Sequence, residues 1–411
     1  MKTEICIIGA GPAGLMAAIS AAAAGARATV VEANTSPGRK LLLTGAGRCN
    51  LTHQDAPQEF VRAFGVGGKF LSYCVFRFSP QDVQDFFARL GLRTKTEKDG
   101  CVFSAFGRAS DVKEALVGCA KTLGATLSYG RQVGGVGKEA GSFVVRTPQE
   151  QISADRLIVA TGGMSWPRTG CTGDGYRFAR HLGHTVTPTK ASLVPLVTGE
   201  VWPGRLAGTA LENVRVSARL GNRKVITVGA MIFTDDGIGG PAVLDMSRHL
   251  TEHLPGKTPI GLTLDLAPHI EQAQLEWQMT EHIAANPRKK VANVLAEFVP
   301  KRLSVLLCRQ ASCDDRLPAG QLKKDVRRKL LRTIKALPLS ILRTKPIAEA
   351  TVTRGGVNIN EVEPKTMESK ICPGLFFAGE VLNVDGPCGG YNLQACWSTG
   401  ALAGSSAARS R

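Results

Sequence analysis

Apolar and polar positions at the start of the chain predict a strand, a turn, a helix and a second strand. An apolar run at residues 4–8 leads into the glycine-rich segment Gly9–Gly14 and then into an alanine-rich stretch that ends near Gly25. A second apolar run, Ala28–Glu32, follows at once. Short apolar runs bounded by glycine are typical of buried strands, and a glycine often ends a helix. We therefore predict a βαβ unit at the beginning of the chain.

The uncharged stretch Ile5–Ala26 is long enough to resemble a membrane span or the apolar core of a secretory signal. Both interpretations fail on its composition. Gly9, Gly11, Pro12 and Gly14 stand in the middle, where such a segment would carry Leu or Val. The stretch also continues into another strand pattern, so we expect a buried strand and helix and a protein that does not engage a membrane.

Between residues 80 and 163, helical and strand patterns alternate. Apolar spacing predicts helices at Gln81–Leu90 and Asp111–Leu123, with a hairpin between them that turns near Asp99-Gly100. Four short strand patterns with glycine punctuation follow, and we interpret them as a meander that leads to a final buried strand. These strands are expected at Thr126–Gly130, Val133–Gly137, Phe143–Thr147 and Arg156–Ala160.

The rest of the chain changes character twice. Short β-like runs alternate with Gly, Pro and Asn from Ser192 to Leu266, which predicts a small β-rich domain. Helical apolar spacing with interleaved basic residues takes over at residues 268–335. A strand pattern at Gly374–Gly379 and a helical pattern at Tyr391–Ala408 close the chain. Because this end resembles the beginning, we expect both ends to complete one domain.

The fold class predicted from this order is α/β, with a Rossmann-like domain that is interrupted by an insertion. A length of 411 residues fits two or three domains. We expect the Rossmann-like domain at residues 1–190 and 346–411, the β-rich domain at 191–266 with part of 336–350, and a basic helical subdomain at 267–335.

Composition places the chain among soluble globular proteins, with 43% hydrophobic and 21% charged residues. Its 11 cysteines are odd in number and scattered, and no CxxC pair occurs; Cys308 and Cys313, which are near neighbours, lack further ligands at zinc-site spacing. His249 and His253 share a helical face without a set of partner ligands. We expect reduced thiols, no metal site and a cytoplasmic protein.

Positive charge is concentrated in the helical zone. The formal net charge is +17, and residues 286–345 contain 16 Lys or Arg against 4 Asp or Glu, a net +12. Such a zone makes RNA binding or RNA modification the competing functional class. A charge run is more often a solvated helix face, and Phe298 is the only aromatic residue in the zone, so a stacking platform for single-stranded RNA is lacking. We therefore regard nucleic acid as the less favoured partner.

The strongest chemical signal is the pattern GxGxxG at Gly9, Gly11 and Gly14. It follows a strand and opens a helix, and Glu32 ends the next strand 18 residues after Gly14. In such units the glycines allow a tight turn, the close approach of a pyrophosphate and the packing of helix on strand, while the acid bonds the ribose hydroxyls. The helix N-terminus faces the phosphates with partial positive charge. The pattern therefore predicts a dinucleotide site.

Three further blocks favour FAD over NAD, because the glycine pattern serves both. Pro37–Asn50 follows Glu32 directly and combines fixed cations with small residues that let a flat ligand approach the backbone. Ala160–Gly163 is a buried strand that ends in a turn. In Gly379–Leu393 a glycine pair opens a helix, whose amide groups and dipole would stabilise negative charge near N1 and O2 of a reduced flavin.

Together these segments resemble the BaiN/YhiN-like family of FAD-binding oxidoreductases over nearly the whole chain. The resemblance implies a non-covalent FAD, a Rossmann-like FAD-binding domain, an inserted β-barrel-like domain and a helical domain. Members of the family have been described as aminoacetone oxidases and as reductases of steroid-like conjugated ketones. The matching motifs are Gly38-Arg-Lys-Leu-Leu with Gly47-Arg-Cys-Asn50, Ala160-Thr-Gly-Gly-Met-Ser-Trp-Pro with Thr172-Gly-Asp-Gly175, Val352-Thr-Arg-Gly-Gly-Val357 and Gly389-Gly-Tyr-Asn-Leu-Gln394.

The resemblance also implies individual contacts to FAD. His53 and Cys388 depart from the pattern expected of relatives, and both concern the substrate side of the flavin. The expected cofactor-binding residues are Gly9, Gly11, Ala13, Gly14, Glu32, Arg39, Lys40, Arg48, Cys49, Asn50, the backbone near Val133, Gly162, Glu380, Asp385, Asn392 and Leu393.

An enzyme of this class moves a hydride between flavin N5 and a small organic substrate, so the protein must also supply a proton donor or acceptor. The candidates are Tyr391 through its hydroxyl, Cys49 through a pKa lowered by the neighbouring Arg48, and Lys40 or Arg48 as stabilisers of an oxyanion. For each of them a flavin-positioning or packing role is an equally good interpretation. Cys49 has no CxxC partner and does not indicate a disulfide reductase.

No second GxGxxG stands between a strand and a helix, because Gly134–Gly141 lies in the predicted meander. A dedicated NAD domain is therefore not expected. Either NAD(P)H reduces the flavin from the substrate cleft, or oxygen accepts the flavin's electrons. A flavin-dependent RNA-modifying protein and a flavin-binding protein without turnover are the alternatives. Neither the substrate nor the oligomeric state follows from the sequence.

Overall fold

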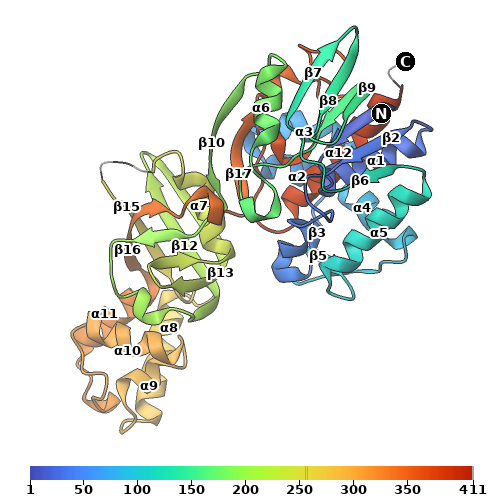
Figure 1. Ribbon diagram of the computed structural model, residues 1–411. Coiled ribbons are helices and arrows are strands. Elements are labelled where there is room, and N and C mark those ends of the chain that lie inside the picture. The colour runs from blue at the N-terminus through green and yellow to red at the C-terminus, as the bar shows by residue number, and fades with distance from the viewer. Residues whose placement is uncertain (255, 257, 410–411) are drawn as a thin grey trace. The chain divides into compact units, whose positions relative to one another are not determined.

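The computed structural model describes residues 1–409 except 255 and 257. Within these residues the chain divides into two compact units. Unit 1 is Met1–Ala191 together with the segment that begins at Ala350, and unit 2 is Ser192–Glu349 (Figure 1). Unit 2 is thus inserted into unit 1, and the two ends of the chain belong to the same unit.

A seven-stranded sheet forms the centre of unit 1. Its strands are β1 (Lys2–Ile8), β2 (Ala28–Val31), β6 (Thr126–Ser128), β7 (Gly135–Glu139), β8 (Ser142–Arg146), β9 (Gln151–Val159) and β18 (Leu375–Phe377). The order is β6-β2-β1-β9-β8-β7, and β18 pairs with β9 beside this path. Strand β1 is parallel to both neighbours, with Ile5 beside Ala28 and Arg156. Its second half is wholly apolar because a central parallel strand is buried on both faces.

Helices α1 (Pro12–Ala23) and α12 (Tyr391–Arg409) pack against each other and run in the same direction. Two glycines allow the close approach: a Cβ at Gly400 would lie 2.4 Å from the carbonyl oxygen of Ala13, and a Cβ at Gly404 would lie 2.1 Å from that of Ala17. Because Gly400 lies beside Ala13, the N-terminal end of α12 extends about eight residues, or ~12 Å, beyond the first residue of α1. The N-termini of the two helices are therefore offset along a common direction.

The sheet differs from the sequence prediction at one edge. We expected four consecutive strands in one meander, but only β7, β8 and β9 pair in that way. Strand β6 lies at the opposite edge, parallel to β2, with Leu127 beside Val30. Helix α5 (Ala109–Thr122) carries the chain there, since parallel strands need a crossover connection. The prediction of a four-strand meander was wrong at its first strand.

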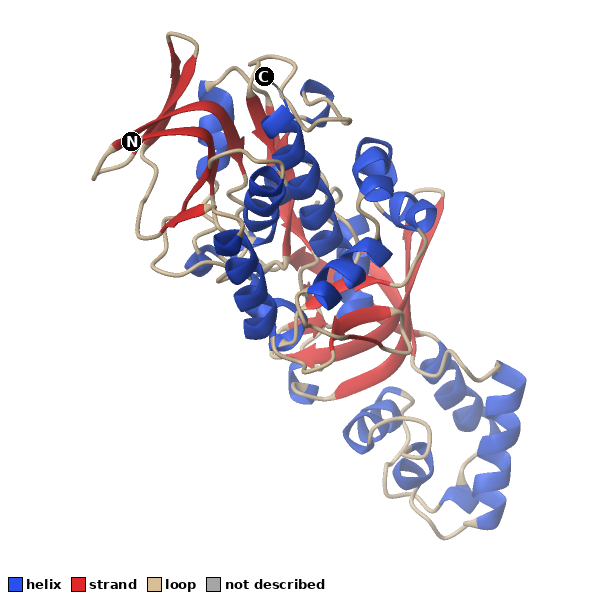
Figure 2. Cartoon of the chain, turned by 90° about the vertical axis from the view of Figure 1, so that its right-hand side faces the viewer, coloured by secondary structure: helices blue, strands red, loops and turns tan. Residues whose placement is uncertain are grey.

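The remaining elements of unit 1 surround this sheet (Figures 1 and 2). They are β3 (Asn50–His53), α2 (Pro57–Ala63), α3 (Gly68–Arg77), α4 (Pro80–Arg89), β4 (Thr94–Thr96), β5 (Cys101–Ser104), α6 (Asp174–His181), β10 (Val186–Ser192) and β17 (Val352–Val357). Strands β3, β5 and β4 form a small sheet that contains the hairpin expected near Asp99-Gly100. Helix α4 begins at a capping box, in which the side chains of Ser79 and Asp82 accept from each other's backbone amides.

Unit 2 contains a closed barrel of six strands. They are β11 (Leu196–Thr198), β12 (Ala210–Leu220), β13 (Arg223–Thr234), β14 (Gly237–Gly239), β15 (Ile260–Asp265) and β16 (Leu337–Thr344), in the order β11-β14-β13-β12-β15-β16. In β12, Val214, Val216 and Ala218 are buried while Arg215 and Arg219 are exposed. This period of two is the pattern from which a half-buried strand is expected.

Helices complete unit 2. They are α7 (Pro241–Leu250), α8 (Gln272–Ala285), α9 (Val291–Leu295), α10 (Lys301–Gln310) and α11 (Lys324–Lys335). One apolar cluster includes Leu264 of the barrel, Leu275 of α8 and Leu303 of α10, so barrel and helices share a core. Among the described residues, no helix has both the length and the apolar character that a membrane crossing requires.

Candidate functional site

The turn between β1 and α1 has the backbone that its glycines require. Gly9 has a φ of 103°, and a Cβ there would lie 2.6 Å from the carbonyl oxygen of Ala160. A Cβ at Gly14 would lie 1.9 Å from the carbonyl oxygen of Gly9, so turn and helix close on each other. Within the described residues a Cβ at Gly11 would have no neighbour within 4 Å, which leaves this side open to a ligand at the N-terminus of α1.

Glu32 follows β2 and is held beside this turn. Its Oε2 accepts from the backbone N–H of Ala10 at 2.7 Å, and its Oε1 accepts from the backbone N–H and the side-chain Nδ2 of Asn34 at 2.8 and 2.7 Å. Only 8% of the residue is exposed. The carboxylate is therefore oriented before any ligand binds, and the remaining lone pair of Oε2 can accept from a ribose hydroxyl.

Asn34 is a residue that the sequence analysis missed. Its Nδ2 also donates to the carbonyl oxygen of Thr169, and its Oδ1 accepts from Nη1 of Arg39 at 2.7 Å. Arg39, an expected cofactor contact, is thus turned toward Glu32 through Asn34. An amide two residues after the acidic residue is too common a pattern to have indicated this role.

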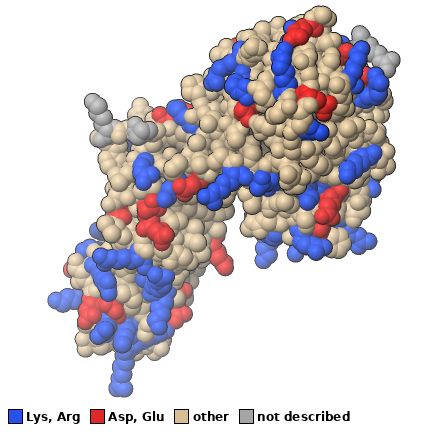
Figure 3. All heavy atoms as spheres, in the orientation of Figure 1, with Lys and Arg blue, Asp and Glu red and all other residues tan. Residues whose placement is uncertain are grey.

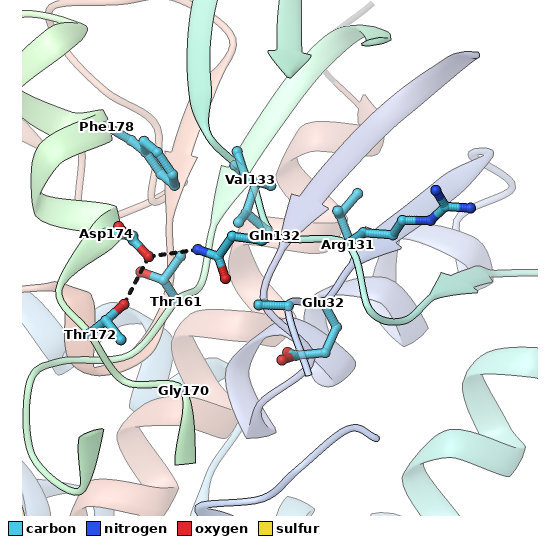
Figure 4. A pocket seen from close by; sticks show the side chains of 13 residues that line it. Glu32, Arg131, Gln132, Val133, Thr161, Gly170, Thr172, Asp174 and Phe178 are labelled. Carbon is cyan, nitrogen blue, oxygen red and sulfur yellow. Dashed lines mark hydrogen bonds between the residues drawn. The ribbon is translucent and has the colours of Figure 1, made fainter. Parts of the chain in front are cut away.

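A pocket opens beside Glu32, at the carboxyl ends of β1 and β2 (Figure 4). The expected contact Val133 lines it, together with Val31, Arg131, Gln132, Gly170 and Phe178, which are not among the expected FAD contacts. Thr161, Thr172 and Asp174 also line it, and they belong to the matching motifs at residues 160–167 and 172–175. Figure 4 shows Gln132 and Thr172 directed at Asp174, to which they donate at 2.9 and 2.8 Å. Burial raises the pKa of Asp174, but hydrogen bonds from Thr172, Arg177 and Gln132 lower it more, so the pKa lies below its usual value. The pocket therefore carries a second fixed carboxylate.

Thr161 carries a polar atom that points to a missing partner. Its Oγ1 is buried, and among the residues that the structure describes it has no hydrogen-bond partner. Thr161 lines the same pocket and lies two residues after the end of β9. A buried hydroxyl without a partner is costly unless a ligand or water completes it. This fits a polar ligand in the pocket.

A buried ion pair joins the two ends of the chain near the turn. Lys40 Nζ lies 2.6 Å from Glu380 Oε2 and donates to Ser165 Oγ at 2.6 Å. Glu380 Oε1 accepts from Ser165 Oγ at 3.0 Å and from the Thr353 backbone N–H at 2.9 Å. Burial lowers the pKa of Lys40, but Glu380, with smaller effects of Cys171 and Cys396, raises it more, so the pKa of the ammonium lies above its ordinary value. The charged groups of Lys40 and Glu380 therefore bind each other in this structure.

Gly162 lies close to this pair. Its φ is 74°, and a Cβ there would lie 3.2 Å from the Cys171 sulfur. A Cβ at Gly163 would lie 2.4 Å from Thr353 Oγ1. The backbone of this turn is therefore packed on one side as tightly as glycine permits.

The segment before α12 is ordered by its own side chains. Asn392 Oδ1 accepts from the Gly386 backbone N–H at 2.8 Å, and its Nδ2 donates to the Gly386 and Pro387 carbonyl oxygens. Asp385 pairs with Arg354 at 3.0 Å, and Leu393 packs against the core of unit 1. Gly389 and Gly390 have φ values of 104° and 93°. Asn392 therefore shapes the glycine turn, and Asp385 is already paired.

Cys49 and Arg48 are catalytic candidates from one segment, and the structure corrects one expectation about them. Cys49 is fully buried, and burial raises the pKa of its thiol to about 12. The lowered pKa expected from the neighbouring Arg48 was wrong, because the Arg48 guanidinium is directed away: it pairs with Glu97 at 2.6 Å and lies 4.0 Å from the centre of the Phe103 ring. Asn50 lies at the start of β3 beside Gly390. Cys49 is therefore an inert buried thiol.

The arrangement fits FAD better than a single nucleotide. The open side of Gly11 and the N-terminus of α1 suit a pyrophosphate, and the pocket with Glu32 suits an adenosine. The N-terminus of α12 lies ~12 Å further along the same direction, given a rise of 1.5 Å per residue. This offset provides a second positive helix end for the other half of an extended dinucleotide. Ala13, with 4% of its surface exposed, lies where α1, Gly379 and α12 meet.

These features define the class of the protein, which is an FAD-dependent oxidoreductase with a Rossmann-type domain. Its family follows from comparison with known proteins. The family described as "HI0933-like protein Rossmann domain" matches residues 3–406, and the chain belongs to this family. The resemblance to the BaiN/YhiN-like flavoproteins noted in the sequence is thereby confirmed.

Two curated relatives match along almost their whole length. The chain is 34% identical to a 3-dehydro-bile acid delta(4,6)-reductase of Clostridium scindens, over 98% of this chain and 99% of the relative. It is 31% identical to a protein of Escherichia coli named ribosomal RNA dihydrouridine synthase, over 97% of this chain and 96% of the relative. The two relatives thus carry names with different substrates.

Solved structures confirm the fold. A 3-ketosteroid-delta4-(5alpha)-dehydrogenase of Rhodococcus jostii matches with a TM-score of 0.55 and 18% identity, over 99% of this chain and 97% of that one. A 3-ketosteroid delta1-dehydrogenase of Sterolibacterium denitrificans matches with a TM-score of 0.55 and 14% identity, over the whole of both chains. At such identities the likeness extends to the fold alone.

Proposed function

We propose that the protein reduces a carbon–carbon double bond conjugated to a carbonyl group, with FAD as its cofactor. The names of the two curated relatives describe reactions of this kind. One is a delta(4,6)-reductase of a 3-dehydro bile acid, and the other makes dihydrouridine, in which the ring double bond of uridine is saturated. Both conversions add a hydride and a proton across a double bond that a carbonyl group polarises. The reaction therefore stays the same while the substrate differs.

The observation that carries the proposal is the offset of two helix N-termini along one direction. Glu32 would bind the adenosine ribose, and the Gly9–Gly14 turn with α1 would bind the pyrophosphate. The amide groups that open α12 at Tyr391 would then stabilise the negative charge of the reduced ring. Bound FAD, once reduced by a nicotinamide dinucleotide, supplies the hydride in this chemistry. Lys40, Glu380 and Asn392 hold the surrounding backbone in place.

Rapid kinetics of the purified holoprotein test the proposal. We expect yellow protein whose bound FAD is bleached anaerobically by NADH or NADPH and is reoxidised by a 3-keto-4-ene steroid or by a uridine-containing RNA. Saturated ketones of the same shape serve as matched controls and should leave the reduced flavin unchanged. An enzyme that instead oxidises an aminoketone with release of peroxide, and ignores every conjugated acceptor, contradicts the proposal.

A second candidate function is the reduction of a uracil ring within an RNA, which the surface of unit 2 favours. Figure 3 shows Lys and Arg gathered over the helical part of this unit. Some of these charges are already engaged: Lys335 pairs with Asp265 at 2.8 Å, and Lys289 pairs with Glu297 at 2.7 Å. The exposed basic residues of α11 and its N-terminal flank are Lys323, Lys324, Arg328, Lys329 and Arg332. They form a row of cations suited to a phosphate backbone.

The structure adds an aromatic residue that the charge count alone overlooked. Trp277 is 63% exposed and belongs to α8, which contacts α11. It lies outside residues 286–345, where only Phe298 is aromatic. An exposed indole on a helix that packs against a basic helix is a combination that single-stranded RNA binders use for stacking. This supports an RNA partner more than the sequence did.

Binding at two salt concentrations separates the two candidates. A ribosomal RNA fragment should bind the holoprotein at low salt and weaken by about tenfold or more at moderate salt, because phosphate contacts release counterions. Replacing Lys324, Arg328 and Arg332 by Gln should remove that binding, whereas Arg215→Gln on the barrel should not. Unchanged reduction of a steroid enone by the triple variant, with no RNA binding by the wild type, would reject the RNA candidate.

A further inference from the structure

Three polar side chains meet at the first residue of α12. Tyr391 Oη donates to Asp55 Oδ2. Asp55 Oδ1 lies 3.0 Å from His53 Nδ1, and the imidazole ring stacks on the Tyr391 ring with 5.2 Å between the ring centres. His53 ends β3, and Asp55 lies in the loop that follows. Polar contacts and ring stacking thus connect His53 through Asp55 to Tyr391.

Hydrogen bonds define where protons can lie in this cluster. His53 Nε2 lies 2.9 Å from the Asp99 carbonyl oxygen, which only accepts, so Nε2 carries a hydrogen. Nδ1 faces the Asp55 carboxyl oxygen at 3.0 Å. Nδ1 also accepts from the Asp55 backbone N–H at 3.3 Å. The contact between Nδ1 and the Asp55 carboxyl group is therefore a place where imidazole and carboxyl group can share one proton.

The groups around the pair do not compete for this proton. Asp99 and Cys101 face His53 from the β4–β5 hairpin, and Gly389 separates Cys101 from Tyr391. Burial, reinforced by Asp99, raises the pKa of the Cys101 thiol to about 12, so it stays protonated. The side chain of Asp55 is 26% exposed and that of His53 is 14% exposed, whereas Tyr391 is 8% exposed. The pair thus reaches solvent, while Tyr391 lies on its inner side.

The position of Tyr391 links the cluster to the proposed reaction. Tyr391 follows Gly389 and Gly390 and opens the helix end that lies ~12 Å beyond the N-terminus of α1, at 1.5 Å per residue. Reduction of a conjugated double bond needs one hydride for the carbon remote from the carbonyl group and one proton for the carbon next to it. The proton must come from a group at the end of the site where the substrate meets the flavin.

We propose that His53, Asp55 and Tyr391 form a proton relay that supplies this proton. The inference rests on the proposed function. As the hydride arrives from the reduced flavin, the O–H bond of Tyr391 breaks and a C–H bond forms on the substrate. The tyrosine oxygen takes the proton shared by Asp55 and His53, and solvent returns a proton to the pair. Tyr391 is the donor, and His53 and Asp55 act through it.

Separate half-reactions test the relay in the holoenzyme. In Tyr391→Phe, reoxidation of the reduced flavin by a 3-keto-4-ene steroid should slow about 100-fold or more, the usual effect of losing a general acid. Reduction of the flavin by NAD(P)H needs no such donor and should change little. Asp55→Asn and His53→Gln should slow reoxidation and retain or enlarge its solvent deuterium isotope effect, because proton transfer through Tyr391 becomes more rate-limiting, while leaving the KM for the steroid near that of the wild type. Tyr73→Phe, on the exposed side of α3, is the matched control. Reoxidation by Tyr391→Phe at the wild-type rate would overturn the relay.

A second measurement does not depend on a substrate. In holoenzyme labelled with ¹⁵N-histidine, the ring-nitrogen chemical shifts of His53 are followed by NMR as the pH is varied and are assigned through His53→Gln. Their pH dependence should change in Asp55→Asn and in Tyr391→Phe. An unchanged His53 titration in both variants would also overturn the relay. If the wild type reduces no conjugated acceptor, the proposed function fails, and this titration alone decides whether the shared proton exists.

Discussion

Lys40 Nζ lies 2.6 Å from Glu380 Oε2, although the two residues are 340 positions apart in the chain. The side chains of Lys40 and Glu380 are only 19% and 15% exposed. Ser165 bonds to both partners, so three distant segments meet at one ion pair. The pair closes unit 1 across the point where unit 2 is inserted.

Removing the cation of this pair should destabilise the protein. Lys40→Met leaves the Glu380 carboxylate buried without its counterion, and we expect a loss of about 3 kcal/mol in the free energy of unfolding. Urea denaturation followed by circular dichroism measures it. Arg146→Met is the control, because the exposed Arg146–Glu139 pair should contribute less than about 1 kcal/mol. Equal effects of the two substitutions would contradict a structural role for the buried pair.

Neutralising the acidic residue beside the glycine turn should weaken FAD binding. Glu32→Gln keeps the shape but replaces a charged acceptor of ribose hydroxyls by a neutral one, and we expect the dissociation constant for FAD to rise about tenfold. Reconstitution of apoprotein with FAD, followed by flavin fluorescence, gives the constant. Glu114→Gln, on the exposed side of α5, should leave it unchanged. Full FAD affinity in Glu32→Gln would remove Glu32 from the site.

The glycine stripe of α12 makes a prediction about packing. Gly404→Ala would place a methyl group 2.1 Å from the Ala17 carbonyl oxygen, so α1 and α12 must separate. We expect a loss of about 2 kcal/mol or more, by the usual cost of overpacking. Gly118→Ala in α5 adds a methyl group with no described neighbour within 4 Å and should be neutral or stabilising by up to about 1 kcal/mol. Thermal denaturation of both variants gives the comparison.

Cys49 should resist alkylation. Its thiol is fully buried, and burial raises its pKa to about 12, so almost no thiolate is present at pH 8. Brief treatment of the folded protein with N-ethylmaleimide, followed by peptide mass spectrometry, should find Cys49 unmodified. The same treatment in urea should modify it. Rapid labelling of Cys49 in the folded state would restore it as a candidate nucleophile.

His184 should make stability depend on pH. Burial lowers its pKa more than Glu361 raises it, so the folded pKa lies below the ordinary value of 6.5. The unfolded chain then binds the proton more readily than the folded one. This contribution to stability is present above pH 6.5 and is lost as the pH falls below it, with a slope of at most about 1.4 kcal/mol per pH unit. Urea denaturation of the wild type and His184→Gln between pH 7 and 5 should show the slope only in the wild type.

The sequence was most informative where a function depends on neighbouring residues. Gly9, Gly11, Gly14 and Glu32 belong to one βαβ unit, so their spacing alone indicates the turn and the acidic residue that it holds. Asp174 and Thr161 share a pocket, yet they come from different elements, and no spacing brings them together. Their role depends on strand order, which sequence patterns do not specify.

Two errors have the same physical origin. Strand β6 looked like part of a meander because nearby strand patterns usually pair, but the crossover through α5 carried it to β2. Cys49 looked activated because Arg48 is its neighbour, but adjacent side chains point in different directions. Arg48 turns to Glu97 and Phe103 while Cys49 turns into the core. In both cases proximity in sequence was mistaken for proximity in space.

Strands β10 and β17 pair at the place where the chain leaves unit 1 and comes back to it. The Asn358 backbone N–H donates to the Thr185 carbonyl oxygen, and a Cβ at Gly355 would lie 2.3 Å from the Pro188 carbonyl oxygen. The outgoing and returning strands therefore lie next to each other. An insertion whose two ends are adjacent can be exchanged for a short turn without breaking its host. Evolution or an engineer can thus replace unit 2 at this junction and keep unit 1.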